Sequence, residues 1–140
     1  MTTRIDIGID GGGTGCRVAL SVAGAAPVEA RGRPANIVSD PAGAEAAIRL
    51  ALTEALSARG LATEALQHAR ICAGLAGARL PGEADRFATR LPFLAHVVDD
   101  SVTALEGALD GADGTLASLG TGSFFIRKAG GTLHHVGGWG

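Results

Sequence analysis

The first part of the chain alternates apolar residues with polar or small ones. Residues 4–10 place Ile5, Ile7 and Ile9 on one face, and residues 16–22 repeat the alternation. A period of two is typical of a strand with one buried face. The intervening residues 11–15 include four glycines, so we predict two strands joined by a glycine turn rather than a strand that feeds a helix. A third, shorter strand is predicted over 28–31.

The middle of the chain changes to helical spacing. Asp40-Pro41 is typical of a helix start, with a carboxylate cap and proline in the first turn, and Gly60 of its end. A second helix is predicted to begin at Pro81 and to end before Pro92, and a third to follow Asp99-Asp100. Short apolar strands are predicted between and after these helices, at 71–75, 93–98, 116–119 and 124–126.

This order of elements predicts an α/β fold with a mixed sheet. A strand, a small-residue turn and a strand recur about a hundred residues after the first hairpin. The repeat predicts a first half-domain over residues 1–113 and the start of a second over 114–140. Because the chain ends in Gly137-Gly138-Trp139-Gly140 without a closing helix, we expect it to be the front part of a longer protein.

Composition excludes several classes of protein. The chain has 140 residues, of which 46% are hydrophobic and 19% charged, as in one soluble domain. A net charge of −2 argues against a nucleic-acid partner. No apolar stretch is long enough to span a membrane, and the N-terminus lacks the pattern of a secretory signal. Two cysteines without a CxxC spacing favour reduced thiols in the cytoplasm.

The first glycine turn is a candidate phosphate site. Asp10 ends a strand and is followed by Gly11, Gly12, Gly13 and Thr14. Glycines let backbone N–H groups approach an anion, and Thr14 adds a hydroxyl. A plain hairpin turn is an equally good interpretation of this segment alone. A P-loop would need Gly-Lys-Ser/Thr, and a dinucleotide fingerprint would need a helix after the glycines.

A second turn offers the same chemistry at Gly120, Thr121, Gly122 and Ser123. If the two turns faced each other, they could hold the phosphates of a nucleotide from both sides. The only lysine is Lys128. The charge of a bound triphosphate would therefore be left to Mg²⁺, which Asp10 could hold through its water shell.

Three further positions are candidates for contact with a substrate. Asp99-Asp100 follows a strand and precedes a helix, where one carboxylate could act as general base while the other caps the helix. The Asn36 amide could bind sugar hydroxyls or be an ordinary loop residue. Trp139 could offer an aromatic face or fill a core.

Taken together, several segments carry a family resemblance: IGIDGGGTGCRVAL, PAN at residues 34–36, AGLAG at 73–77, VVDDSVTALEGAL, SLGTGS and the terminal GGWG. They resemble the N-acetylglucosamine kinase branch of the BadF/BadG/BcrA/BcrD ATPase family, within the actin, sugar-kinase and heat-shock-chaperone superfamily. The resemblance implies a ribonuclease-H-like ATPase domain, in which a mixed sheet has helices on both faces.

The resemblance also implies an activity and the residues that carry it. The expected reaction is ATP-dependent phosphorylation of the 6-hydroxyl of N-acetylglucosamine or glucosamine, with Asp100 as catalytic base. It implies that Asp10–Thr14 and Gly120–Ser123 are the nucleotide loops and that Asp10 holds Mg²⁺. It also implies that Asn36, Gly138 and Trp139 contact the sugar. Relatives carry the adenosine pocket and other sugar ligands farther along, so these 140 residues are expected to be inactive alone. Many relatives form dimers, so the resemblance makes a homodimer possible and leaves the oligomeric state open.

Two other functions stay open. One is an ATPase activator of a 2-hydroxyacyl-CoA dehydratase type of system, which would hold an iron–sulfur cluster through later cysteines. No cysteine follows Cys72 in this chain, which weakens this alternative. The other is a non-catalytic module that senses a nucleotide or a sugar.

Overall fold

The computed structural model describes residues 3–120 and 123–138. The chain divides into two compact units, Met1–Asp100 and Ser101–Gly140. The division lies ahead of the boundary predicted between residues 113 and 114. It falls there because side chains of helix α3 (Asp100–Leu109) form hydrogen bonds with the strands that follow it. Whether residues 114–140 open a second half-domain stays a prediction.

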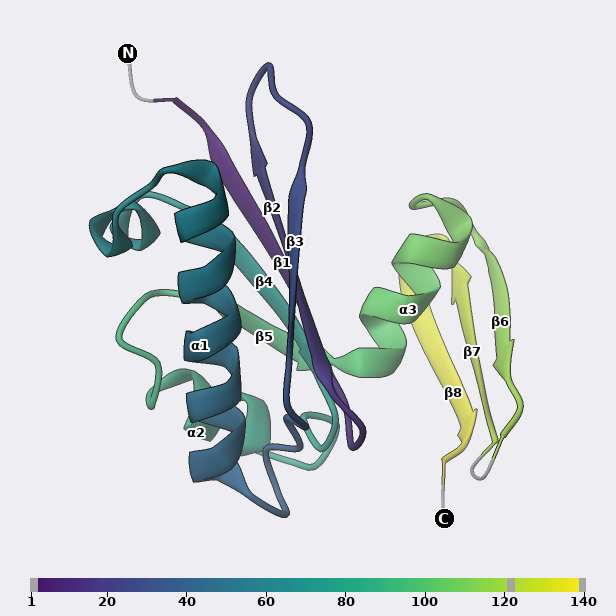
Figure 1. Cartoon of the computed structure of the whole chain (residues 1–140). Coiled ribbons are helices and arrows are strands. Elements are labelled where there is room, and N and C mark those ends of the chain that lie inside the picture. Colours follow the sequence, from purple (N-terminus) through teal and green to yellow (C-terminus); the bar gives the residue numbers. More distant parts are fainter. Residues whose placement is uncertain (1–2, 121–122, 139–140) are drawn as a thin grey trace. The chain divides into compact units, whose positions relative to one another are not determined.

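A five-stranded mixed sheet forms the first unit (Figure 1). Its strand order is β3-β2-β1-β4-β5. Strands β1, β2 and β3 pair antiparallel, whereas β4 and β5 continue the sheet parallel to β1. The strands are β1 (Ile5–Gly11), β2 (Cys16–Val22), β3 (Val28–Gly32), β4 (Arg70–Leu75) and β5 (His96–Asp99). The predicted α/β class and mixed sheet are confirmed.

Helix α1 (Pro41–Arg59) covers one face of this sheet. Its N-cap is Asp40, whose carboxylate accepts from the N–H of Gly43 at 2.9 Å, and its C-cap is Gly60 in the left-handed conformation. The helix buries one stripe of side chains: Ala44, Ala47, Ile48, Ala51, Leu52, Ala55 and Leu56. The helix lies mainly over β3 and β2, and its buried stripe joins the buried side chains of β1, β2 and β4 in one core. This part of the core follows directly from the two sequence periods.

Two shorter elements differ from the prediction. Helix α2 (Glu83–Ala88) begins two residues after Pro81, because Gly82 has a φ of 79° and cannot be helical. The predicted strand over 93–98 is shifted to β5, since Phe93 is buried in the core before pairing with β4 begins at His96. A 3-10 helix, η1 (Thr63–Gln67), was not predicted.

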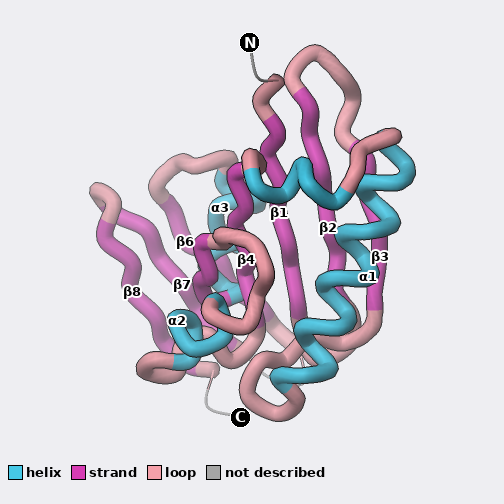
Figure 2. The backbone as a smooth tube through the Cα atoms, turned by 90° about the vertical axis from the view of Figure 1, so that its left-hand side faces the viewer, coloured by secondary structure: helices cyan, strands magenta, loops and turns pink. Residues whose placement is uncertain are grey.

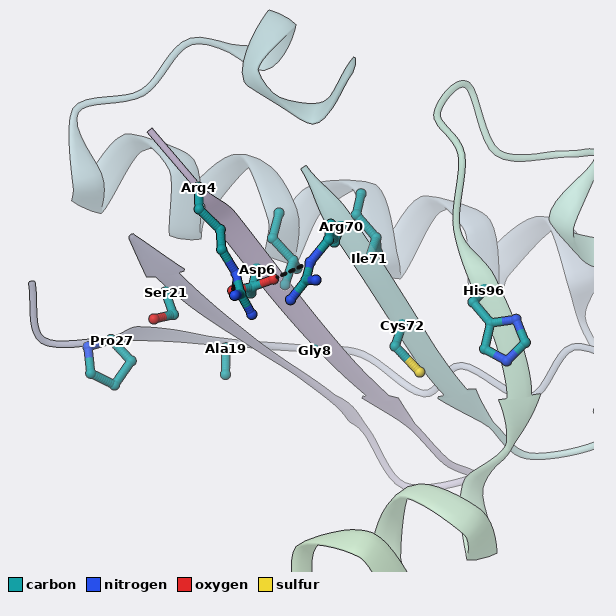
Figure 3. A pocket seen from close by; sticks show the side chains of 11 residues that line it. Arg4, Asp6, Gly8, Ala19, Ser21, Pro27, Arg70, Ile71, Cys72 and His96 are labelled. Carbon is teal, nitrogen blue, oxygen red and sulfur yellow. Dashed lines mark hydrogen bonds and ion pairs between the residues drawn. The ribbon is translucent and has the colours of Figure 1, made fainter. Parts of the chain in front are cut away.

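Helices α1 and α2 lie on the same side of the five-stranded sheet (Figures 1 and 2). The helix layer predicted for the other face is not present within residues 3–100. That face carries small and polar side chains, including Asp6, Ala19 and Cys72, and residues along it line a shallow pocket of about 680 Å³ (Figure 3). Within the described residues no helix is long and apolar enough to cross a membrane.

The second unit contains most of α3 and a three-stranded antiparallel sheet of β6 (Gly114–Ser118), β7 (Phe124–Ala129) and β8 (Thr132–Gly137). Leu105 of α3 and Ile126 of β7 are both fully buried. Lys128 donates to the Glu106 carboxylate at 2.7 Å and to the carbonyl oxygen of Gly111 at 3.0 Å. The only lysine of the chain therefore ties β7 to the end of α3.

Candidate functional site

The carboxyl ends of the three parallel strands bring the predicted site residues of the first unit to one edge of the sheet (Figure 1). The register aligns Gly11 of β1 with Leu75 of β4, and Leu75 with Asp99 of β5. Neighbouring strands are about 4.8 Å apart, so the backbones of Gly11 and Asp99 lie about 10 Å apart. This is the edge at which open α/β sheets bind their ligands.

Backbone hydrogen bonds fix the first glycine turn to two other segments. The N–H of Ala76 donates to the carbonyl oxygen of Gly11 at 2.8 Å, and the N–H of Ala35 donates to that of Gly12 at 2.8 Å. The N–H of Gly12 donates within the turn to Gly15 at 2.9 Å. Because the N–H of Gly12 is bonded to Gly15, it is not available to an anion. Among the donors predicted in this turn, those of Gly13 and Thr14 are left.

Glycine occurs at the positions of this turn for different structural reasons. At Gly11 a Cβ would come within 2.7 Å of Leu75 and 3.0 Å of Ala35, so packing requires glycine there. At Gly13 a Cβ would meet nothing within 4 Å, and at Gly12 only the carbonyl oxygen of Gly15 at 3.9 Å. Neither residue has a φ in the left-handed region. Ordinary turn geometry therefore does not explain Gly12 and Gly13, whereas close approach of a ligand would.

Asp10 lies beside this turn and is paired with an arginine. The Arg17 guanidinium donates to the Asp10 carboxylate at 3.0 Å, and both side chains are more than half exposed. Both line a pocket of about 450 Å³ together with Gly12, Thr14 and Arg31. Arg17 was not among the residues predicted from the sequence. Strand pairing places it opposite Asp10, and aligning the two predicted strands about their glycine turn could have found it.

Asn36 reaches the same edge through the loop after β3. Its backbone forms a parallel bridge with Ala76, next to the residue that ends β4. Its side-chain oxygen accepts from the N–H groups of Val38 at 3.0 Å and Ser39 at 3.1 Å. The loop role and the predicted sugar role are therefore compatible, because the oxygen shapes the turn and the NH₂ group is left for donation to a hydroxyl.

The aspartate doublet is divided between two elements. Asp99 ends β5 and Asp100 begins α3, and both side chains are half-buried. The structure thus places Asp100 at the edge shared by the first glycine turn and Asn36. Its role as base stays a prediction.

The second turn belongs to the second unit. Gly120 and Ser123 are exposed, and the N–H of Gly138 donates to the Ser123 carbonyl oxygen at 3.0 Å. Gly137 and Gly138 have φ values of 86° and 76°, so a left-handed stretch begins at the last residue of β8. The predictions for Thr121, Gly122 and Trp139 fall outside the described residues.

Three other side chains of the first unit have shifted pKa values. Hydrogen bonds from Arg70 and Arg4 hold the pKa of Asp6 below its usual value on the open sheet face (Figure 3). Burial raises the pKa of the Cys16 thiol, and the negative charge of Asp10 raises it further. Partial desolvation also raises the pKa of Cys72, although its side chain is exposed. Neither thiol is therefore an activated nucleophile.

Comparison with known proteins gives two amino-sugar kinases. Glucosamine kinase GspK of Vibrio cholerae serotype O1 is 34% identical over 138 residues, which cover 94% of this chain and 46% of that protein. The crystal structure of a candidate N-acetylglucosamine kinase from Chromobacterium violaceum matches with a TM-score of 0.88 and 31% identity, over 98% of this chain and 50% of that one. No protein-family model matches.

A third match supports the fold alone. The ethanolamine utilization protein EutJ from Carboxydothermus hydrogenoformans has a TM-score of 0.60 at 14% identity, over 98% of this chain and 53% of that one. The predicted fold class is confirmed by these solved structures. The chain spans about half the length of the curated relative it matches.

Proposed function

We propose that the protein is an ATP-dependent kinase that phosphorylates the 6-hydroxyl of an amino sugar, either N-acetylglucosamine or glucosamine. The observation that carries the proposal is the open turn at Gly12 and Gly13, on the sheet edge that also holds Asp10, Asn36 and Asp100. The two kinases to which the chain is similar support the same class of reaction. Membership of the BadF/BadG/BcrA/BcrD family, a cytoplasmic location and a homodimer stay predictions.

Each residue at the edge has a proposed task. Backbone N–H groups of Gly13 and Thr14 bind the transferred phosphoryl group, because the surroundings of Gly13 leave room for it. The Asn36 amide donates to a sugar hydroxyl and orients the ring. Asp100 accepts the proton of the 6-hydroxyl as its oxygen attacks phosphorus, a contribution of about 10²–10⁴-fold in rate. The roles of Gly120–Ser123 in nucleotide binding and of Gly138 and Trp139 in sugar binding stay predictions from the resemblance.

The donors at this edge fit a Mg²⁺ ion. Mg²⁺ keeps most of its water and is held by one or two carboxylates together with substrate phosphates. Asp10 supplies one exposed carboxylate beside the turn. Within residues 3–120 and 123–138 no cluster of three metal-binding side chains is found. If Mg²⁺ is bound, Asp10 would hold it through its water shell, and the ion would supply neutralisation of the phosphate charge.

The test is coupled ADP release by the full-length gene product with Mg²⁺-ATP. Parallel reactions contain N-acetylglucosamine, glucosamine, glucose or no sugar. Release that depends on one amino sugar would support the kinase and identify its substrate. Sugar-independent release would favour the ATPase activator, and nucleotide or sugar binding without release would favour the sensing module.

A further inference from the structure

The buried side of helix α3 carries a polar residue. Its buried side chains are Ser101 and Leu105, which lie one turn apart on the same side of the helix. Ser101 is 5% exposed and is the only buried polar residue within residues 3–120 and 123–138. A buried hydroxyl costs free energy unless it is hydrogen-bonded, and alanine at this position would avoid that cost. A hydroxyl here therefore indicates a specific contact.

The partner of this hydroxyl is His135 of strand β8. Ser101 Oγ and His135 Nε2 are hydrogen-bonded at 2.9 Å, between residues 34 positions apart in the sequence. His135 lies directly opposite Ile126 in the sheet, and Ile126 is fully buried like Leu105. His135 is half-buried, whereas His134 is exposed, as expected for successive residues of a strand. The imidazole of His135 therefore lies on the side of the sheet that faces α3.

Helix α3 is fixed to the three-stranded sheet at both ends (Figure 1). The Ser101–His135 bond holds its first turn to β8, and the Lys128–Glu106 bond holds its last turn to β7. Only the first of these bonds adjoins a residue proposed to take part in the reaction, because Asp100 is the first residue of α3 and precedes Ser101. The bond that holds Ser101 therefore also holds the start of the helix, where Asp100 lies.

Strand β8 leads from His135 to the predicted sugar-binding segment. Gly138 lies three positions after His135, and its N–H donates to the Ser123 carbonyl oxygen at 3.0 Å. Two hydrogen bonds within the second unit thus join the start of α3, the end of β8 and the residue that ends the second turn. Loss of the His135 side chain would release the helix start from this connected segment.

We propose that His135 is a positioning residue for phosphoryl transfer. Through its hydrogen bond with Ser101 it holds the first turn of α3, and thereby the Asp100 carboxylate, in the orientation that accepts the sugar proton. The inference rests on the proposed function of Asp100 as base. Orientation is worth a directional bond at this place, because a displacement of about 1 Å at a reacting group can cost about 10²-fold in rate.

Steady-state kinetics of the full-length gene product, with Mg²⁺-ATP and the amino sugar it accepts, test the inference. His135→Ala should lower kcat about tenfold and change the KM for ATP less than about twofold, because it misplaces the base and leaves the first glycine turn intact. Ser101→Ala should lower kcat by a similar factor. His135→Gln should restore most of kcat, since its amide can replace Nε2 in the hydrogen bond with the Ser101 hydroxyl.

A double-mutant cycle with Asp100→Asn separates positioning from a general loss of structure. Residues that act as a unit have non-additive effects on the rate. If His135 acts through the Asp100 carboxylate, His135→Ala should not lower the residual kcat of Asp100→Asn any further. An equal loss of kcat in both backgrounds, as expected for a general loosening of the fold, would overturn the inference.

His134→Ala is the matched control. It removes the same type of side chain from the exposed side of β8 and should leave kcat unchanged. Each variant is assayed below its unfolding midpoint, and Ser101→Ala takes the place of His135→Ala in the cycle if the latter does not fold. Wild-type kcat in folded His135→Ala or Ser101→Ala would overturn the inference and leave the kinase intact. A wild-type protein that phosphorylates no sugar would refute the proposed function and this role with it.

Discussion

A methyl group on Gly11 would lie 2.7 Å from Cδ2 of Leu75, the residue beside it on β4. Gly11 is thus fixed by packing, although it belongs to the same turn as two glycines that are not. The contrast makes a clear prediction. Gly11→Ala should destabilise the protein by about 1–3 kcal/mol, as expected for overpacking, whereas Gly13→Ala should leave the thermal unfolding midpoint at or above that of the wild type.

The same pair of variants separates packing from binding. Gly13→Ala adds its methyl group where the phosphoryl group is proposed to approach, so it should weaken ATP binding in a titration despite its stability. An unchanged Kd for ATP in folded Gly13→Ala would show that the open space at the turn is not used by the nucleotide.

A substitution at Asn36 can keep the side-chain oxygen that shapes the loop and remove only the NH₂ group proposed to bind the sugar. Asn36→Asp retains an oxygen that can accept from Val38 and Ser39, but it removes the NH₂ donors. We expect an unchanged unfolding midpoint and a KM for the sugar that rises about tenfold, with little change in the KM for ATP. Asn36→Ala should additionally destabilise the loop. Equal sugar KM values for Asn36→Asp and the wild type would limit Asn36 to the loop role.

Asp100→Asn should separate chemistry from binding. The amide cannot accept the proton of the sugar hydroxyl, so kcat should fall by about 10²–10⁴-fold while the Kd for ATP stays nearly unchanged. Asparagine is also accepted at helix starts, so α3 should persist in circular dichroism. Asp85→Asn, which changes an exposed carboxylate in α2, is the control. A normal kcat in Asp100→Asn would exclude this residue as the base.

The two cysteines should react with iodoacetamide slowly and in a fixed order. Both thiols have a pKa above the usual value, so the reactive thiolate is scarce at pH 7 and increases as the pH rises toward and beyond that value. Cys72 is exposed on the open sheet face, whereas Cys16 is buried. Mass mapping should therefore detect alkylation at Cys72 first, with faster labelling at pH 9 than at pH 7. Faster labelling of Cys16 would contradict this packing.

The fold could be predicted where one periodic pattern governs a whole element. Helix α1 follows from Asp40, its apolar stripe and Gly60, and Glu45 and Arg49, four residues apart on the helix, form an ion pair at 3.6 Å. The ends of strand β5 and helix α2 were predicted wrongly, because local packing and backbone conformation determine them. Phe93 is taken up by the core, and Gly82 adopts a left-handed conformation.

The candidate site could be predicted less completely, because register decides which residues meet. The strand ends identified Asp10 and Asp99-Asp100, and the structure places them at one edge. The bridge between Asn36 and Ala76 and the use of the Gly12 N–H inside the turn depend on loop conformation, which no periodicity encodes. Arg17 was missed because it was treated as a strand residue and not as the cross-strand neighbour of Asp10.

The most direct test of the proposed kinase is the position of the phosphate in the product. The full-length gene product would be incubated with Mg²⁺-ATP and either N-acetylglucosamine or glucosamine, and the mixture followed by ³¹P nuclear magnetic resonance. We predict a new phosphomonoester signal coupled to the two protons of C6, formed in proportion to ADP. Inorganic phosphate as the only product beside ADP, with either sugar, would contradict an amino-sugar kinase.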